Sequence, residues 1–258
     1  MSVRPGIDQD AIDRVLHRLF IGAPGTSLRD EDRCKVKEMQ GLLAEIAATV
    51  SRRSRQHKLV MVDAAAGKSV VGLLAAELIL SPLGRSGRVH IIERDGRRVA
   101  ACQLALSRLQ APGVEVAIAK ADVGDTQAWP ARPDVVVALH ACGPASDLII
   151  DRAIAVQARD LLLVPCCTSK HVTAAALAER HAEALAIPRH AEVRRRFIQA
   201  MVDAERTLRL DAAGWQTTVV AFVAPTVTPH NLLWRCQHVG EPGRMAEAAR
   251  QRARLMQI

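Results

Sequence analysis

Aromatic residues are scarce in this chain of 258 residues: three Trp and three Phe make up 2% of it, and Tyr is absent. Proteins that bind unpaired nucleic-acid bases usually stack them on aromatic side chains. The shortage therefore counts against a single-strand-binding module. Because 49% of the residues are hydrophobic, the chain can still bury a full core, which has to be built from Ala, Val, Leu and Ile.

Long apolar runs are also missing, and so is an apolar segment close to the first residue. A membrane-spanning helix would need about 20 consecutive apolar residues. The six cysteines are spread from Cys34 to Cys236, which is typical of a chain in a reducing compartment. We therefore expect a soluble, cytoplasmic protein with no membrane segment and no disulfide bonds.

Basic residues outnumber acidic ones by 35 to 27, so that the net charge is +8. Such a charge favours a polyanionic partner, for example RNA, if the basic residues cluster on one surface. It is equally compatible with Arg side chains that only solvate helix faces. The sequence leaves open whether the basic clusters at 52–55 and 194–196 form one patch, and it does not indicate an oligomeric state.

The first 57 residues are polar and helical in pattern, and we expect them to form a helical cap. The helical spacing is clearest in one apolar set: Met39, Leu42, Leu43, Ile46 and Val50. The segment "IGAPGTS" at 21–27 separates two helical pieces. The last segment, 241–258, begins with Gly and Pro within "GEPG" and predicts a short basic helix.

Between these segments, in 58–240, short β-rich runs alternate with Ala-rich helices, which is the pattern of a parallel sheet with crossover helices. Seven strands are expected: "KLVMVD", "RVHIIE", "VEVAIAKAD", "DVVVALHA", "DLLLVPCC", "WQTTVVAFVAP" and "NLLWRCQHV". Only "APTVTPH" separates the last two, so they should form an antiparallel hairpin. The fold class is therefore α/β, a Rossmann-like, mostly parallel sheet with helices on both faces.

The loop after the first strand, "DAAAGKS", can be interpreted in two ways. Its end resembles a phosphate loop, but that motif needs a Gly where Val62 stands. The alternative is a nucleoside loop, in which an acid ends the strand and small residues let the backbone approach the ligand. Asp63, Ala65, Gly67 and Ser69 would then occupy the positions of the pattern Asp-x-Gly-x-Gly-x-Gly. Ala is not expected to adopt the positive φ that Gly allows.

Acidic residues also follow the next two strands. Glu93 ends the second strand, where a carboxylate can accept both hydroxyls of a ribose, and Asp122 follows the third, where it can accept from an adenine amine. Acids after three consecutive strands describe a pocket for S-adenosylmethionine better than one for a dinucleotide. The predicted cofactor-binding residues are Asp63, Ala65, Gly67, Lys68, Glu93, Arg94, Asp122, Val123, His140 and Cys142.

Strands four and five run into "ALHACGPASD" and "LVPCCTSK", at the edge where open α/β sheets bind ligands. One interpretation is a zinc site made by His140, Cys142, Cys166 and Cys167, but these spacings chelate poorly. A second is a nucleophilic or redox cysteine activated by His140 or Lys170. The favoured one is a pocket wall with compact, mostly buried cysteines, in which His140 is a hydrogen-bonding group or general base. No metal site is predicted.

These segments, with "DAAAGKS" and "DAERTLRLDAAGWQTTVVAFVAPTVTPHNLL", resemble the class I methyltransferase family that groups methyltransferase-like proteins with the tRNA 2′-O-methyltransferases of the acceptor stem. The resemblance covers roughly residues 35–240 and implies S-adenosylmethionine as cofactor. Thr168 stands where the family has His or Tyr, and the zinc-binding modules of the tRNA enzymes are absent. The tRNA substrate is therefore implied less strongly than the cofactor.

The turn Thr228-Pro229-His230-Asn231 also matches the family's Thr-Pro-x-Asn pattern. Asn231 either borders the acceptor site or only bonds the local backbone. His140, Lys170 and Asn231 are the predicted catalytic groups.

We therefore expect a methyltransferase that acts on a nitrogen or oxygen acceptor, with RNA as one candidate. One alternative acceptor is a small molecule or peptide. Another alternative is a non-catalytic binding protein of the same fold, suggested by the lost glycines. A phosphate-loop hydrolase is disfavoured by Val62 and by the lack of a magnesium-holding motif.

Overall fold

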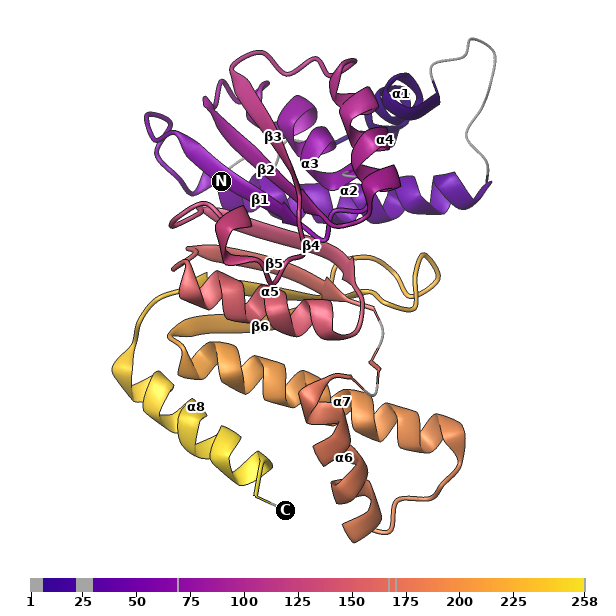
Figure 1. Cartoon of the computed structure of the whole chain (residues 1–258), viewed down its shortest axis with the longest axis vertical. Helices are drawn as coiled ribbons and strands as arrows, with labels where there is room; N and C mark the ends of the chain where they lie inside the picture. The colour runs from indigo at the N-terminus through magenta and orange to yellow at the C-terminus, as the bar shows by residue number, and fades with distance from the viewer. Residues whose placement is uncertain (1–6, 22–29, 69, 167, 170, 258) are drawn as a thin grey trace.

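A computed structural model describes residues 7–21, 30–68, 70–166, 168–169 and 171–257 (Figure 1). Seven strands form one sheet: β1 (Leu59–Ala64), β2 (Gly87–Glu93), β3 (Val114–Lys120), β4 (Val135–Ala141), β5 (Asp160–Pro165), β6 (Trp215–Ala221) and β7 (Leu232–His238). The helices are α1 (Gln9–Leu16), α2 (Asp30–Ser51), α3 (Val70–Ala75), α4 (Gly96–Leu106), α5 (Pro144–Ala155), α6 (Thr173–Ala184), α7 (Ala191–Ala212) and α8 (Pro242–Leu255), with short π- or 3₁₀-helical turns at His17–Ile21, Ala76–Leu80 and Thr126–Ala128.

The strand order is β3-β2-β1-β4-β5-β7-β6. The first five strands are parallel, and β7 pairs antiparallel with both β5 and β6. Each expected strand is present, although β6 ends at Ala221, earlier than its apolar run suggested. The predicted fold class is confirmed: a seven-stranded, mostly parallel sheet with helices on both faces and a terminal hairpin.

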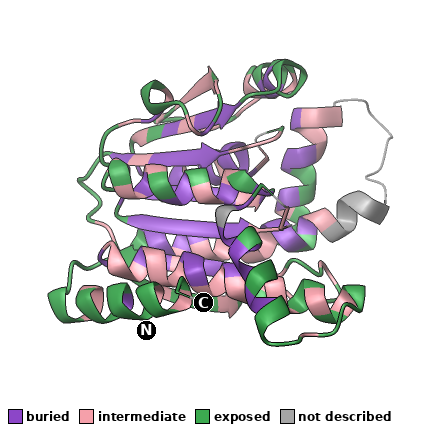
Figure 2. Ribbon diagram, turned by 60° about the horizontal axis from the view of Figure 1, so that its bottom comes forward, coloured by how far each residue is buried: buried purple, intermediate pink, exposed green. Residues whose placement is uncertain are grey.

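The two faces of the sheet carry separate cores, because alternate side chains of a strand point to opposite sides. On one face, Met61 of β1 and Val137 of β4 pack with apolar residues of α1, α2, α3 and α4. On the other face, Val62 and Val136 pack with residues of α5 and α7, including Leu210. The central strands are buried on both faces (Figure 2), as continuous apolar runs in parallel sheets usually are.

The N-terminal helical segment differs from the expected cap. Met39, Leu42, Leu43 and Ile46 of α2 are all fully buried and belong to the same core as β1 and β4. Because this apolar stripe faces the sheet, α2 is a structural layer of the domain and not a lid above it. The division into 1–57, 58–240 and 241–258 stays a prediction.

The basic clusters at 52–55 and 194–196 do not form one patch. Arg52 and Arg53 pair with Asp160 at the start of β5. Arg194 and Arg195 instead border a cavity together with Thr168, which follows the end of that strand. The two basic clusters therefore lie at opposite ends of β5. None of the described helices is both long and apolar enough to cross a membrane.

Candidate active site

A cavity of about 360 Å³ opens at the carboxyl ends of the parallel strands. Its walls come from the loops that follow β1, β2, β3 and β4 and from the first turns of α4 and α5. It is lined by Ala65, Glu93, Arg94, Arg98, Ala121, Asp122, Val123, His140, Cys142, Pro144, Ala145 and Leu148. Parallel strands end at one edge, so residues far apart in sequence meet there.

Seven of the ten predicted cofactor-binding residues line this cavity; the exceptions are Asp63, Gly67 and Lys68. Asp63 is 1% exposed, and its Oδ2 accepts a hydrogen bond from the backbone N–H of Gly72 at 2.8 Å. It therefore fixes the start of α3. Lys68 is exposed, and Ser69 lies outside the described residues. The binding roles of all ten residues stay predictions.

Glu93 is held rigidly at the end of β2. Its side chain is buried, Oε2 accepts from the N–H of Gly67 at 2.7 Å, and Oε1 accepts from the N–H of Asp95 at 2.8 Å. A carboxylate offers about four acceptor positions. Glu93 can therefore anchor the loop after β1 and still accept hydrogen bonds from two hydroxyls of a ligand.

The opposite side of the cavity combines a carboxylate with an apolar wall. Asp122 accepts from the N–H of Gly124 at 2.9 Å and lies 3.5 Å from Arg94 Nη1. Leu148 on α5 lines the cavity and stays 37% exposed. Sequence analysis missed Leu148 together with Arg98, Pro144 and Ala145, although a large apolar residue in the first turn after the His-x-Cys-Gly segment was a usable signal.

Ala65 corrects an expectation about the first loop. It adopts φ 53°, in the left-handed region, and Gly67 adopts φ 62°. The expectation that Ala would avoid a positive φ is therefore wrong at this position. The pairing of Gly67 with Glu93 and the bond from Ala66 N–H to the Ile92 carbonyl at 3.1 Å hold the loop in this shape.

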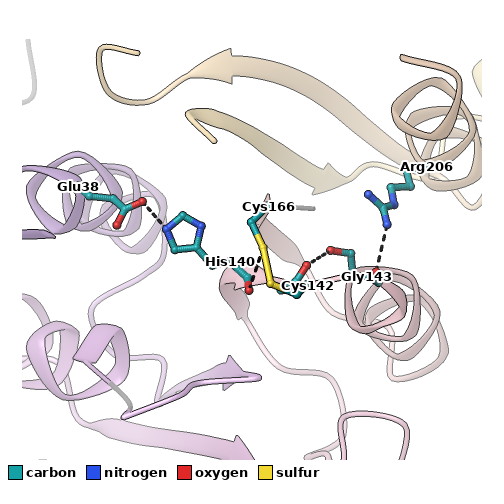
Figure 3. The surroundings of a disulfide bond; sticks show 8 residues. Glu38, His140, Cys142, Gly143, Cys166 and Arg206 are labelled. Carbon is teal, nitrogen blue, oxygen red and sulfur yellow. Dashed lines mark hydrogen bonds and ion pairs between the residues drawn. A yellow bond between two sulfur atoms is a disulfide. The ribbon is translucent and has the colours of Figure 1, made fainter. Parts of the chain in front are cut away.

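His140 occupies a β-bulge at the end of β4. Leu139 pairs with Val164 and Ala141 with Pro165, so that His140 is an extra residue in the register, at φ 56°. Bulges occur often beside active sites because they redirect a side chain. Here the bulge accompanies a contact with α2: His140 Nε2 lies 2.6 Å from Glu38 Oε1 (Figure 3).

Glu38 is a site residue that sequence analysis missed. Its carboxylate is almost fully buried, and its Oε2 also accepts from Lys35 Nζ at 2.6 Å. Burial alone raises the pKa of Glu38, but the contacts with His140 and Lys35 outweigh it, so that the pKa falls below its ordinary value. Glu38 is therefore ionised at neutral pH. The Nδ1 atom of His140 has no hydrogen-bond partner among the described residues.

His230, in the loop between β6 and β7, is the second imidazole at this site. Its ring meets the ring of His140 edge to face, with centroids 6.3 Å apart. Burial and the nearby charges of His140 and Arg195 lower the pKa of His230. The adjacent Asn231 donates from Nδ2 to the carbonyl of Val223 at 3.0 Å, which supports the turn interpretation. A catalytic role for Asn231 stays a prediction.

The cysteines differ from expectation in two respects. Cys142 and Cys166 form a disulfide, with Cα atoms 5.5 Å apart (Figure 3), so the expectation of no disulfides is wrong. The physical reason is the register of β4 and β5: Ala141 pairs with Pro165, which places the next residues side by side. Cys142 is also exposed and not buried.

Two other predicted residues, Lys170 and Cys167, lie outside the described residues. Within the described part of the chain, no group of three or more His, Cys, Asp or Glu side chains could hold a metal ion.

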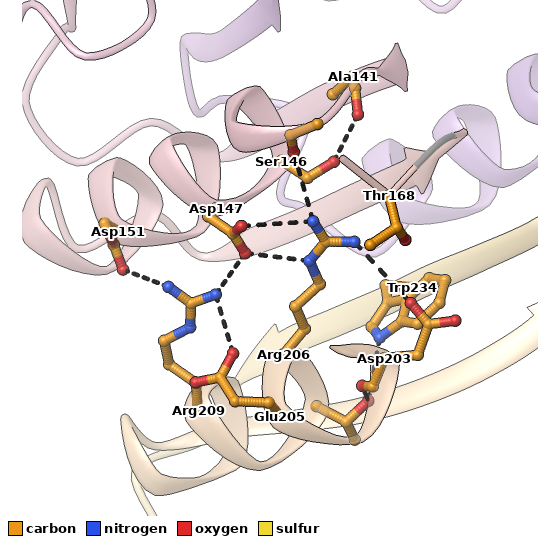
Figure 4. Close-up of polar contacts among 12 residues, drawn as sticks. Ala141, Ser146, Asp147, Asp151, Thr168, Asp203, Glu205, Arg206, Arg209 and Trp234 are labelled. Atoms are coloured by element: carbon orange, nitrogen blue, oxygen red, sulfur yellow. Dashed lines mark hydrogen bonds and ion pairs between the residues drawn. The ribbon is translucent and has the colours of Figure 1, made fainter. Parts of the chain in front are cut away.

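A buried ion-pair network supports the site from below (Figure 4). Arg206 on α7 is 1% exposed, donates from Nε to Asp147 Oδ1 at 3.0 Å, and donates from Nη2 to the Gly143 carbonyl at 3.4 Å. Ser146 Oγ donates to the Ala141 carbonyl at 2.6 Å. Ser146 therefore fixes the "CGPASD" segment to β4, and Asp147 fixes it to α7. These contacts give both residues a structural role.

A family model described as a methyltransferase domain matches residues 34–174, more than half of the chain. The chain belongs to this methyltransferase family. Membership confirms the expected enzyme class, an S-adenosylmethionine-dependent methyltransferase, over the alternative of a non-catalytic binding protein. It does not establish the narrower resemblance to the tRNA 2′-O-methyltransferases. No curated protein matches the sequence.

Two solved structures are similar to this methyltransferase at low sequence identity. The CMeT domain of the citrinin polyketide synthase is 11% identical, with a TM-score of 0.50, over 88% of this chain and 60% of that one. Magnesium protoporphyrin IX methyltransferase from Synechocystis PCC 6803, crystallised with SAH, is 14% identical, with a TM-score of 0.48, over 90% of this chain and 97% of that one.

Proposed function

We propose that this methyltransferase transfers a methyl group from S-adenosylmethionine to a nitrogen or oxygen atom of its acceptor, and that His140 takes the proton that the acceptor loses. The observation that carries the proposal is the bulged position of His140, which borders the cavity and contacts the buried carboxylate of Glu38.

The residues of the cavity fit this cofactor. Glu93 has acceptor positions left for two ribose hydroxyls, Asp122 can accept from an adenine amine, and Leu148 offers an apolar surface to the base. The sulfonium of the bound cofactor supplies the methyl group in an activated form. Most of the remaining rate enhancement is expected from the orientation of the acceptor.

The pair formed by Glu38 and His140 suits proton removal. Because Nε2 lies 2.6 Å from Oε1 of Glu38, Nδ1 is the nitrogen left to accept a proton. Nδ1 is buried and has no hydrogen-bond partner among the described residues, so the acceptor has to displace the side chains that cover it. The buried negative charge of Glu38 then stabilises the imidazolium that forms. His140 acts as the general base, and Glu38 is a positioning residue.

Calorimetric titration with S-adenosylmethionine and S-adenosylhomocysteine tests the cofactor site. Glu93→Gln and Asp122→Asn should each weaken binding about tenfold or more, because each removes a charged acceptor. Glu115→Gln is the matched control, since Glu115 lies on β3 and pairs with Arg88 outside the cavity. A folded wild-type protein that binds neither ligand would rule out the proposed function.

Transfer of a labelled methyl group tests the base. His140→Gln should lower kcat by about 10²- to 10⁴-fold, with a much smaller change in S-adenosylhomocysteine affinity. Glu38→Gln should lower kcat less, because the imidazole remains. Unchanged kcat in both variants would show that the acceptor needs no base.

RNA remains the acceptor suggested by the net charge of +8 and by the family resemblance. A small molecule or peptide is favoured instead by the scarcity of aromatics and by the separation of the two basic clusters. The salt dependence of acceptor binding distinguishes RNA from a small molecule or peptide. The affinity for RNA should fall steeply as the salt concentration rises, because phosphate contacts release counterions.

A further inference from the structure

A second cavity, of about 430 Å³, lies beside the cofactor cavity. It is formed by the loop after β5, by α6 and by the start of α7, which lie side by side below the sheet in Figure 1. Among its lining residues are Thr168, Ser169, Ala175 and Ile198. A pocket of this size suits a small organic molecule.

The two cavities share a thin wall. Gly143 stands between Cys142 and Pro144, which line the first cavity. A Cβ atom at Gly143 would lie 3.0 Å from Oγ of Ser169, which lines the second. A molecule in the second cavity is therefore next to the loop that carries Cys142. Cys142 follows His140 by two positions in the chain.

The rim of the second cavity carries three Arg side chains and one carboxylate, that of Glu179. Arg194 forms an ion pair with Glu179, with Nε 2.7 Å from Oε2. Among the described residues, Arg195 pairs with Glu192 of its own helix, and its side chain is 72% exposed. Arg189 makes no ion pair with any described residue. Arg189 is therefore available to an anionic ligand, above an apolar floor that includes Ala175 and Ile198. Arg195 can join it by giving up its exposed pair with Glu192, because surface ion pairs of this kind contribute little stability.

The same rim acts electrostatically on His230, the imidazole beside the proposed base. The positive charge of Arg195 contributes to the lowered pKa of His230, and His230 contacts the ring of His140. His140 lines the first cavity and Arg195 the second, and His230 lies against the ring of His140.

We propose that this cavity binds a small acceptor through a carboxylate or phosphate group, which Arg189 and Arg195 recognise, while its apolar part packs on Ala175 and Ile198. The acceptor's reactive atom then reaches past Gly143 and Ser169 toward His140. The inference rests on the proposed function and names its substrate class. Guanidinium groups recognise both anions through paired hydrogen bonds.

Hexanoate and hexyl phosphate are suitable probes, because each joins an apolar chain to one of the two anions. Calorimetric titration of the full chain, in the presence of S-adenosylhomocysteine, should detect binding of at least one of them, and the stronger probe identifies the anion. Arg189→Gln and Arg195→Gln should each weaken that binding about tenfold, the loss expected for one charged hydrogen bond.

Arg196→Gln is the control, since Arg196 follows on the same helix, is 78% exposed and does not line the cavity. It should leave probe binding unchanged. Equal weakening by all three variants would overturn the proposal, as would binding of neither probe to protein that binds S-adenosylhomocysteine. Absence of S-adenosylhomocysteine binding would instead contradict the proposed function. RNA binding that depends on Arg189 and Arg195 without probe binding would replace the small acceptor with a nucleic acid.

Discussion

At the scale of single residues, Ala65 adopts a backbone conformation that glycine reaches more easily, at φ 53°. A non-glycine residue in the left-handed region costs about 1–2 kcal/mol, whereas Gly costs roughly 0.5–1 kcal/mol more chain entropy than Ala on folding. Ala65→Gly should therefore leave the free energy of unfolding unchanged or raise it by up to about 1.5 kcal/mol.

Ala66→Gly is the matched control, because Ala66 is the next residue and has no positive φ. It should lower the free energy of unfolding by roughly 0.5–1 kcal/mol. Urea denaturation of both variants measures the difference. Equal destabilisation by the two substitutions would contradict the left-handed conformation at Ala65.

His230 supports a second prediction, on pH. Burial, His140 and Arg195 lower its pKa below the ordinary 6.5. Its contribution to stability is therefore complete above pH 6.5 and is lost as the pH falls through the lowered pKa. An NMR titration of the ring should give a midpoint below 6.5, and Arg195→Gln should raise it. Arg196→Gln should leave the midpoint unchanged; a shift as large as that of Arg195→Gln would refute the assignment.

At the scale of elements, the contact between α5 and α7 depends on Asp147. It accepts hydrogen bonds from Arg206 at 3.0 Å and from Arg209 at 2.6 Å, and Arg206 is buried. Asp147→Asn removes the nearest carboxylate from that buried charge and leaves Asp203, 3.8 Å from Arg206 Nη1, as its remaining acidic partner. The substitution should therefore cost about 3 kcal/mol, the lower end of the cost of breaking a buried pair.

Asp151→Asn provides the comparison, because Asp151 is 51% exposed and contacts only Arg209 of this network. Asp151→Asn should lower the free energy of unfolding by less than about 1 kcal/mol. The free energy of unfolding of the two variants decides the point. If both lose the same amount, the network does not hold α5 against α7.

At the scale of the whole molecule, a ligand that binds only the folded state raises its stability. S-adenosylhomocysteine at 100 times its Kd should add about 2.7 kcal/mol, which corresponds to a rise in Tm of roughly 5–10 °C for a chain of this size. Thermal unfolding with and without the ligand measures the rise. Glu93→Gln at the same ligand concentration should show a smaller rise; an equal rise would exclude Glu93 from the site.

The amino-acid sequence by itself determined the number, order and approximate limits of the strands, because each is a short apolar run between polar loops. It also indicated the edge of the sheet at which the cavity lies, since acids and small residues follow consecutive parallel strands. Glu93 and Asp122 were predicted at the cavity for this reason, and both line it.

Only the tertiary structure decided which distant residues meet. Glu38 lies in a helix about a hundred positions before His140, and nothing in the local pattern of either residue predicts their contact. The register of β4 and β5 paired Cys142 with Cys166 and placed His140 in a bulge. Local periodicity reports which face of a strand or helix is apolar, whereas register and helix packing decide which side chains come together.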